Sequence, residues 1–176
     1  LKIKPDDAEV YQNMGIAFKA KGAFDAAIAS FKKAIEIKPE NAEAYNSLGV
    51  AFYKQRQLDE AIDSYTKAIK IKPAYSEPYN NMGLVLKDKG DLNAAAEFYN
   101  MALSISPTDA EAHCNMGLFL GERRDPEAAI VFYNKALKIK PNFDSARAHR
   151  LYQQANICDW AAIEEDRNLI PELGTL

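Results

Sequence analysis

The sequence predicts an all-α protein built from a tandem array of antiparallel helix pairs. The first observation is a series of prolines spaced at a constant interval of 34 residues. The second is that the segments between them repeat the same glycine, alanine and aromatic columns. A period of this length is typical of solenoid proteins, whose repeats pack only against their neighbours. The prolines of the series are Pro5, Pro39, Pro73, Pro107 and Pro141.

Composition indicates a folded chain and excludes several classes. Of the 176 residues, 48% are hydrophobic and 27% charged, as in ordinary globular proteins. The net charge of -3 argues against a nucleic-acid partner, since such proteins usually carry a basic surplus. No apolar run approaches the roughly 20 residues of a membrane span, and no signal peptide opens the chain. The two cysteines make no disulfide framework, which favours a reducing compartment and a cytoplasmic location.

Each repeat opens three residues after its proline, and this residue is position 1 of the repeat. Position 8 is always glycine, positions 20 and 27 are alanine, and position 24 is a large aromatic residue. Positions 4, 7, 8 and 11 share one helical face, and positions 20, 24, 27 and 28 share another. We therefore expect two helices of about 14 residues, with position 24 filling the space beside the small residues. The repeats open at Ala8, Ala42, Ser76 and Ala110.

Helix-ending residues agree with this division. Polar residues able to cap the first helices are Asp7, Asn41, Ser76 and Asp109. Gly22 and Gly90 stand at position 15, where a left-handed residue ends a helix. Arg56 and Arg124 replace glycine there, so those turns are either strained by about 1 kcal/mol or use another geometry. Asp125-Pro126-Glu127 has the order of a cap, a first-position proline and a first-turn acid.

The array predicts three parts. Residues 1–5 resemble the end of a second helix and are expected to be the tail of a truncated preceding repeat. Residues 6–141 form four complete units, and residues 142–176 a half-repeat cap followed by a short helix. In the last part Asp144 is expected to cap a helix reaching about Ile157, although arginines replace apolar residues in it. Asp159 is expected to cap the short helix from Trp160 to about Asn168.

These columns resemble the tetratricopeptide repeat, with its aromatic, Leu-Gly, Ala, aromatic, Ala and Pro pattern across residues 8–141. The resemblance implies a right-handed superhelix of antiparallel helix pairs, an α-solenoid whose first helices line a concave groove. His113 departs from the pattern at position 4, where Tyr11, Tyr45 and Tyr79 stand, and is expected to have a core role.

A second resemblance concerns the end of the chain. Cys158-Asp159-Trp160 resembles the junction between repeats and catalytic region in glycosyltransferases of the O-linked N-acetylglucosamine transferase type, and residues 166–174 resemble the bacterial members. It implies that the repeats recruit substrates for a larger transferase. No catalytic region lies within this sequence, so no catalytic residue is assigned to it.

The groove residues come from three columns of the first helices. Positions 5 and 6 carry mainly amides, which donate and accept hydrogen bonds and could pair with the backbone of an extended peptide. A solvated polar face is the alternative. Position 9 is apolar, so it either holds ligand side chains or is partly covered by neighbouring helices. The predicted peptide-binding residues are Gln12, Asn13, Asn46, Ser47, Asn80, Asn81, Cys114, Asn115, Ile16, Val50, Leu84 and Leu118.

Two further expectations concern charge and chemistry. Position 2 is acidic in all four repeats, which either complements the helix dipole or disfavours acidic ligands. No spacing predicts a metal site, a cofactor site or a catalytic nucleophile, so the chain itself is not expected to be an enzyme. Three function classes remain: a scaffold for a protein or extended peptide, the recruiting arm of a glycosyltransferase, and a self-assembly module that associates through exposed repeat ends.

Overall fold

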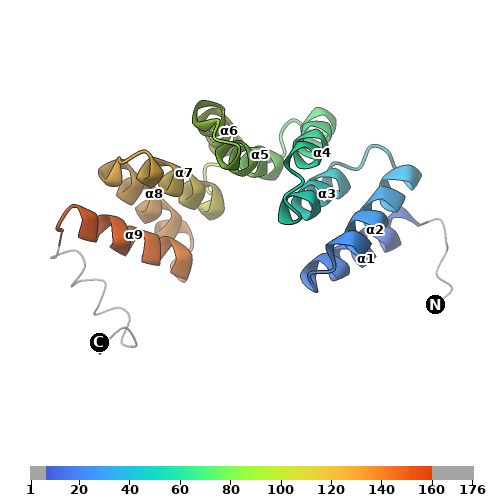
Figure 1. The fold of residues 1–176 in the computed structure, drawn as a ribbon, viewed down its shortest axis with the longest axis horizontal. Helices are drawn as coiled ribbons and strands as arrows, with labels where there is room; N and C mark the ends of the chain where they lie inside the picture. The colour runs from blue at the N-terminus through green and yellow to red at the C-terminus, as the bar shows by residue number, and fades with distance from the viewer. Residues whose placement is uncertain (1–6, 160–176) are drawn as a thin grey trace. The chain divides into compact units, whose positions relative to one another are not determined.

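The computed structural model describes residues 7–159, which form α-helices joined by short turns (Figure 1). The first helices of the repeats begin at the four residues that the period predicts. The predicted tail over residues 1–5 and the predicted helix from Trp160 to Asn168 lie outside the described residues. The helices are α1 (Ala8–Ala20), α2 (Phe24–Ile37), α3 (Ala42–Lys54), α4 (Leu58–Ile71), α5 (Ser76–Asp88), α6 (Leu92–Ile105), α7 (Ala110–Glu122), α8 (Pro126–Ile139) and α9 (Asp144–Asn156).

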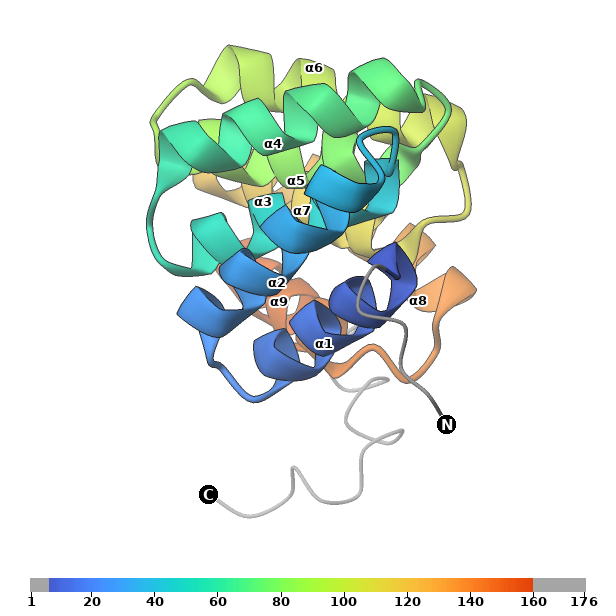
Figure 2. The same cartoon turned by 90° about the vertical axis from the view of Figure 1, so that its right-hand side faces the viewer.

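The helices pack in pairs within two compact units. The first unit, Leu1–Ile105, holds α1 to α6, and the second, Ser106–Leu176, holds α7 to α9. Each first helix packs against the second helix of its own repeat (Figures 1 and 2). Within the units, α2 also packs on α3, α4 on α5, and α8 on α9. This arrangement confirms the predicted all-α solenoid of helix pairs.

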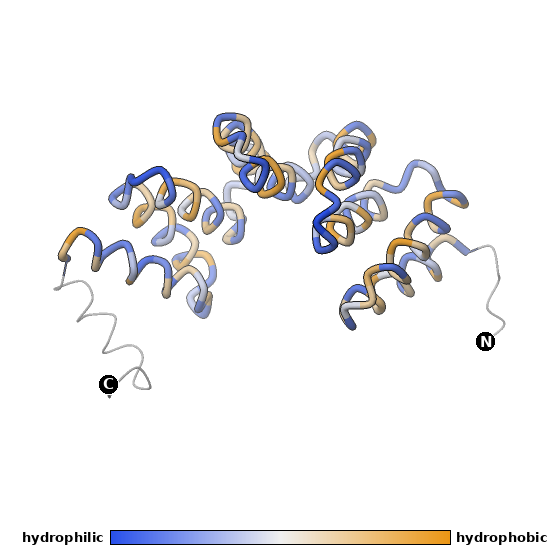
Figure 3. Tube along the Cα trace, viewed as in Figure 1, coloured by the Kyte–Doolittle hydropathy of each residue, from blue (hydrophilic) through white to orange (hydrophobic). Residues whose placement is uncertain are grey.

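Every pair is held by an aromatic ring seated on a glycine. The helices carry both hydrophobic and hydrophilic residues along their length (Figure 3), and the hydrophobic ones meet inside each pair. A Cβ atom built on Gly49 would lie 2.5 Å from Cε1 of Tyr65, whose side chain is almost completely buried. The same contact recurs between Gly15 and Phe31, Gly83 and Tyr99, and Gly117 and Tyr133. The predicted packing of a large residue against small ones is therefore confirmed in all four repeats.

The helix caps confirm most predictions and correct two. Four of the predicted capping residues accept a hydrogen bond from a backbone amide of the first turn through a side-chain oxygen. These residues are Asp7, Asn41, Asp109 and Asp125. Ser76 was expected to be a cap but is the first residue of α5, after the extended residue Tyr75.

Asp144 is likewise the first residue of α9, and Phe143 is the N-cap without a side-chain hydrogen bond. Ser76 and Asp144 both stand at position 1 of the repeat, one residue after the place of the N-cap in the other first helices. The helix start follows the packing period, and the polar side chain cannot shift it by one residue.

The two arginines at position 15 adopt the left-handed conformation. Arg56 and Arg124 have φ angles of 63° and 62°, close to the 74° of Gly22. Of the two alternatives for these turns, strain is therefore correct, because a side chain in this region costs roughly 1 to 2 kcal/mol. Arg56 also donates to Asp88 over 2.8 Å, an exposed ion pair that offsets little of this cost.

The fifth first helix keeps the register of the other four, although arginines replace apolar residues in it. Cys158 stands at position 15 and has a φ of 58°. The following residue, Asp159, donates its amide to the carbonyl of Gln154 over 2.9 Å, as Asp125 does to Leu120 over 3.0 Å. Cys158 and Asp159 thus occupy the ordinary turn that ends a first helix.

Arg147 replaces the expected apolar residue at position 4 for a specific reason. Its guanidinium donates to the carbonyl of Pro141 over 2.6 Å. His113 makes the same contact through Nε2 with Pro107 over 2.9 Å, and Tyr79 donates to Pro73 over 3.0 Å. His113 is buried, as predicted, and its ring also packs on Phe132 with centroids 5.8 Å apart. Position 4 therefore fastens α5, α7 and α9 to the prolines before them.

Candidate ligand-binding surface on the first helices

Position 5 joins consecutive first helices and is mostly not open to a ligand. Asn46 is only 5% exposed. Its amide nitrogen donates to Tyr75 and to Glu77, each over 3.1 Å, and its oxygen accepts from Asn81 over 3.0 Å. Both ends of the amide are therefore used between α3 and α5, where a peptide backbone would have to displace them.

The other members of position 5 are also enclosed. Asn80 and Cys114 are buried, as Asn46 is, so three of the four predicted groove residues at position 5 are enclosed by the protein. Gln12 is half-buried and accepts from Asn41 over 2.7 Å. Because this bond joins the first two repeats in the manner of Asn46, position 5 is chiefly a link between repeats.

Cys114 is not an activated thiol. Burial raises its pKa to about 11, and the charge of Glu111 acts in the same direction. A hydrogen bond with Ser145 opposes these effects but does not reverse them. A thiol with a raised pKa is a poor nucleophile, so the structure supports the expected inert role.

Position 6 is the more accessible polar column. Asn13 is exposed, whereas Ser47, Asn81 and Asn115 are half-buried. Asn81 already donates to Asn46, which leaves its oxygen side for further contacts. Of the predicted row at position 6, Asn13 is therefore the most accessible member.

At position 9, too, the residue of the first repeat is the most exposed. Ile16 is 42% exposed, and Val50, Leu84 and Leu118 are half-buried. Val50 and Leu118 pack against the hydrophobic cores of their units. Partial cover by neighbouring helices describes Val50 and Leu118, and Ile16 is the most accessible member of the column.

A polar hollow lies where α1, α3 and the end of α2 meet. Its volume is about 330 Å³, and it contains the two predicted site residues Gln12 and Asn13. The remaining lining residues are Ala8, Glu9, Lys38, Asn41 and Glu43. The hollow therefore offers amide donors and acceptors together with charges of both signs, a set that suits the backbone and polar side chains of a peptide.

The sequence did not place Lys38 or Asn41 on a binding surface, since Lys38 follows the second helix and Asn41 was assigned only as a cap. Glu9 and Glu43 are position-2 acids, for which a bias against acidic ligands was one of two alternatives. Glu43 also bonds Lys72 over 2.7 Å, which holds the pKa of its carboxyl below the ordinary value. Lys38 lowers that pKa further through its charge. The hollow was not visible in one repeat because residues of two repeats line it.

No group of three or more His, Cys, Asp or Glu side chains within residues 7–159 is placed to hold a metal ion. In the same part of the chain no helix is both long and apolar enough to cross a membrane.

Comparison with known proteins agrees with this architecture. The tetratricopeptide repeat profile matches residues 42–75 and 110–143, and a related TPR repeat profile matches residues 17–56 and 83–122. The chain matches no curated protein sequence.

Solved structures share the fold over most of the chain. The crystal structure of MamA is 30% identical, with a TM-score of 0.68 over 80% of this chain and 82% of its own. The structure of Pseudomonas aeruginosa pilF is 21% identical, with a TM-score of 0.85 over 96% of this chain and 77% of its own. A chain of the APC/C hetero-tetramer Cut9-Hcn1 is 18% identical, with a TM-score of 0.87 over 94% of this chain and 33% of its own. Together with the matching profiles, the repeat columns and the stacked helix pairs, these likenesses show that the chain belongs to the tetratricopeptide repeat family.

Proposed function

We propose that the chain is a protein-binding scaffold that holds an extended segment of a partner against its first helices. The observation that carries the proposal is the polar hollow at α1 and α3, which contains Gln12 and Asn13, about one helical turn before the exposed Ile16 on α1. Amides that donate and accept can bind a peptide backbone without reading its side chains. Ile16 supplies an apolar contact for one ligand side chain.

The test is affinity selection from a random peptide library on the whole chain, followed by titration of the selected peptides against variants. Asn13→Ala is expected to weaken binding about threefold to tenfold, the range for one lost hydrogen bond. Asn100→Ala is the matched control, since Asn100 is an exposed amide on the second helix α6. Equal affinity of both variants and the unaltered chain would remove Asn13 from the binding surface.

The narrower assignment to a glycosyltransferase remains a prediction. The ordinary repeat turn accounts for Cys158 and Asp159 without any junction, so the proposal does not draw on them. The reading frame after Leu176 decides the matter. A nucleotide-sugar-binding α/β region there supports recruitment of substrates for sugar transfer, and a stop codon removes it.

Two further expectations are carried forward with their tests. Self-association through exposed repeat ends predicts a mass above that of the monomer in light scattering across a dilution series, and a constant monomer mass counts against it. A cytoplasmic location is supported by the two cysteines, which are free thiols, and is checked by fractionation of cells that express the parent protein.

A further inference from the structure

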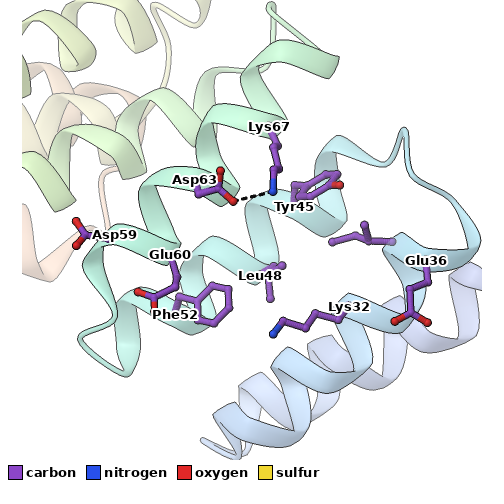
Figure 4. A pocket seen from close by; sticks show the side chains of 10 residues that line it. Lys32, Glu36, Tyr45, Leu48, Phe52, Asp59, Glu60, Asp63 and Lys67 are labelled. Atoms are coloured by element: carbon purple, nitrogen blue, oxygen red, sulfur yellow. Dashed lines mark hydrogen bonds and ion pairs between the residues drawn. The ribbon is translucent and has the colours of Figure 1, made fainter.

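A second cleft lies between α2 and the pair of α3 and α4 (Figure 4). Its volume is about 560 Å³, and it shares no residue with the polar hollow. Within the described residues α2 packs on α3 and does not pack on α4, so the cleft opens between the two second helices.

The floor of the cleft is apolar and aromatic. Ile35 comes from α2, and Tyr45, Leu48 and Phe52 come from α3. The two rings already face ammonium groups: Lys32 lies 5.6 Å from the centroid of Phe52, and Lys67 lies 5.9 Å from that of Tyr45. Floor rings that accept cations in this way could also accept those of a partner.

The rim that α4 contributes is acidic. Asp63 bonds Lys67 over 2.7 Å, and Asp59 bonds Lys89. The side chain of Glu60 is exposed, and within residues 7–159 its carboxylate makes no hydrogen bond or ion pair, although its backbone carbonyl accepts from Ser64. The carboxylate of Glu60 is therefore available to a cation of a binding partner.

The repeat fold does not require this acidic rim. Asp59, Glu60 and Asp63 stand at positions 18, 19 and 22, which are acidic together in this repeat alone. Because the four repeats share one fold, the acids found together at these positions in the second repeat alone indicate a property of this surface and not of the fold. The equivalent residues are Asp25, Ala26 and Ala29 in the first repeat, Asn93, Ala94 and Glu97 in the third, and Glu127, Ala128 and Val131 in the fourth.

We propose that this cleft is a second docking surface, which takes a basic amphipathic helix of a protein partner. Apolar side chains of that helix at i, i+3, i+4 and i+7 rest on Ile35 and Tyr45, the half-buried members of the floor, as in helix-in-groove recognition. Lysines or arginines on its flanks lie toward the rim at Glu60, where opposite charges steer association and set specificity. A partner on this surface leaves the hollow at Asn13 free, so the chain can hold two segments at once.

The experiment uses the whole chain and two synthetic peptides of equal length. One has leucines at i, i+3, i+4 and i+7 with lysines on both flanks, and the other has glutamate in place of each lysine. Addition of the lysine peptide to the isotope-labelled chain is expected to shift the amide resonances of residues 32–36 and 59–63. The glutamate peptide is expected to leave them unchanged.

Two variants test whether the lysine peptide binds at the acidic rim of the cleft. Glu60→Lys is expected to weaken binding of the lysine peptide on the order of fivefold, since it exchanges an exposed attraction for a repulsion. Glu127→Lys is the matched control, because Glu127 is also an exposed first-turn acid of a second helix. It is expected to bind as the unaltered chain does.

Four results would overturn the proposal: no binding of either peptide, equal binding of both, the same loss in both variants, or shifts confined to Asn13 and Ile16. Asn13→Ala tests the other surface, and it is expected to leave binding of the lysine peptide intact. Failure of one docking surface can therefore be told from failure of the other.

Discussion

At the residue scale, the glycine at position 8 sets how closely the helices of a pair approach. We predict that Gly49→Ala lowers the free energy of unfolding by about 1 to 3 kcal/mol, the usual cost of overpacking. The new Cβ would meet the Tyr65 ring at 2.5 Å, and that ring is almost completely buried, so the two helices must move apart or the ring must shift. Urea denaturation followed by circular dichroism measures the change.

Gly121→Ala is the control for this prediction. Its Cβ would first meet the amide nitrogen of Gln153, the end of a flexible side chain, so a smaller loss is expected. An equal loss in both variants would show that the aromatic ring does not set the spacing of the pair.

The two cysteines are predicted to react very differently with alkylating agents. At pH 8 about one thousandth of the Cys114 thiol would be thiolate, given its pKa of about 11, and the side chain is buried. Cys158 is exposed. Because only the thiolate attacks, iodoacetamide should modify one thiol quickly, and Cys158→Ser should abolish that fast phase. Cys114→Ser should retain it, whereas fast modification of folded Cys158→Ser would contradict the prediction.

At the scale of the helices, the buried Asn41 both caps α3 and joins the first two repeats. Its side-chain oxygen accepts from Ala44 over 3.0 Å, and its nitrogen donates to Gln12. We predict that Asn41→Ala lowers the free energy of unfolding by about 1 to 2 kcal/mol. Ser76→Ala should change it by less than about 0.5 kcal/mol, because Ser76 is not a cap. Chemical denaturation of both variants checks the contrast, and equal losses would refute it.

Helix boundaries were predictable from the sequence because they repeat. The period places the starts of α1, α3, α5 and α7 correctly, since packing of one repeat on the next imposes the same register on each. Ser76 and Asp144 were misread as caps because cap preference is a local rule, and the packing register overrides it.

The candidate site was less predictable, for a different reason. The sequence indicated the first helices and the columns, but it did not reveal that Asn46 is consumed by bonds to Tyr75, Glu77 and Asn81. Those partners lie 29 to 35 residues away. The residue type at position 5 does not show which residues of the next repeat it will contact. The sequence alone therefore could not distinguish an amide that bonds to the next repeat from one that is exposed to solvent.

At the scale of the whole molecule, each compact unit has a hydrophobic core of its own. The core of the first unit is built around Phe31, Phe52 and Tyr65, and that of the second around Tyr133. We predict that residues 1–105 fold by themselves, as expected for solenoids stabilised by neighbouring repeats. Circular dichroism should show a helical fragment with a cooperative thermal transition. A fragment without such a transition would mean that the first unit depends on the second.

The hydrogen bond at position 4 has a consequence for which residues can stand there. A phenol, an imidazole and a guanidinium perform the same task in Tyr79, His113 and Arg147. The contact therefore requires a side-chain donor that reaches the carbonyl of the preceding proline, and it does not require an aromatic ring. A terminal helix such as α9 can be tied to the repeat before it although its position 4 carries a charged residue.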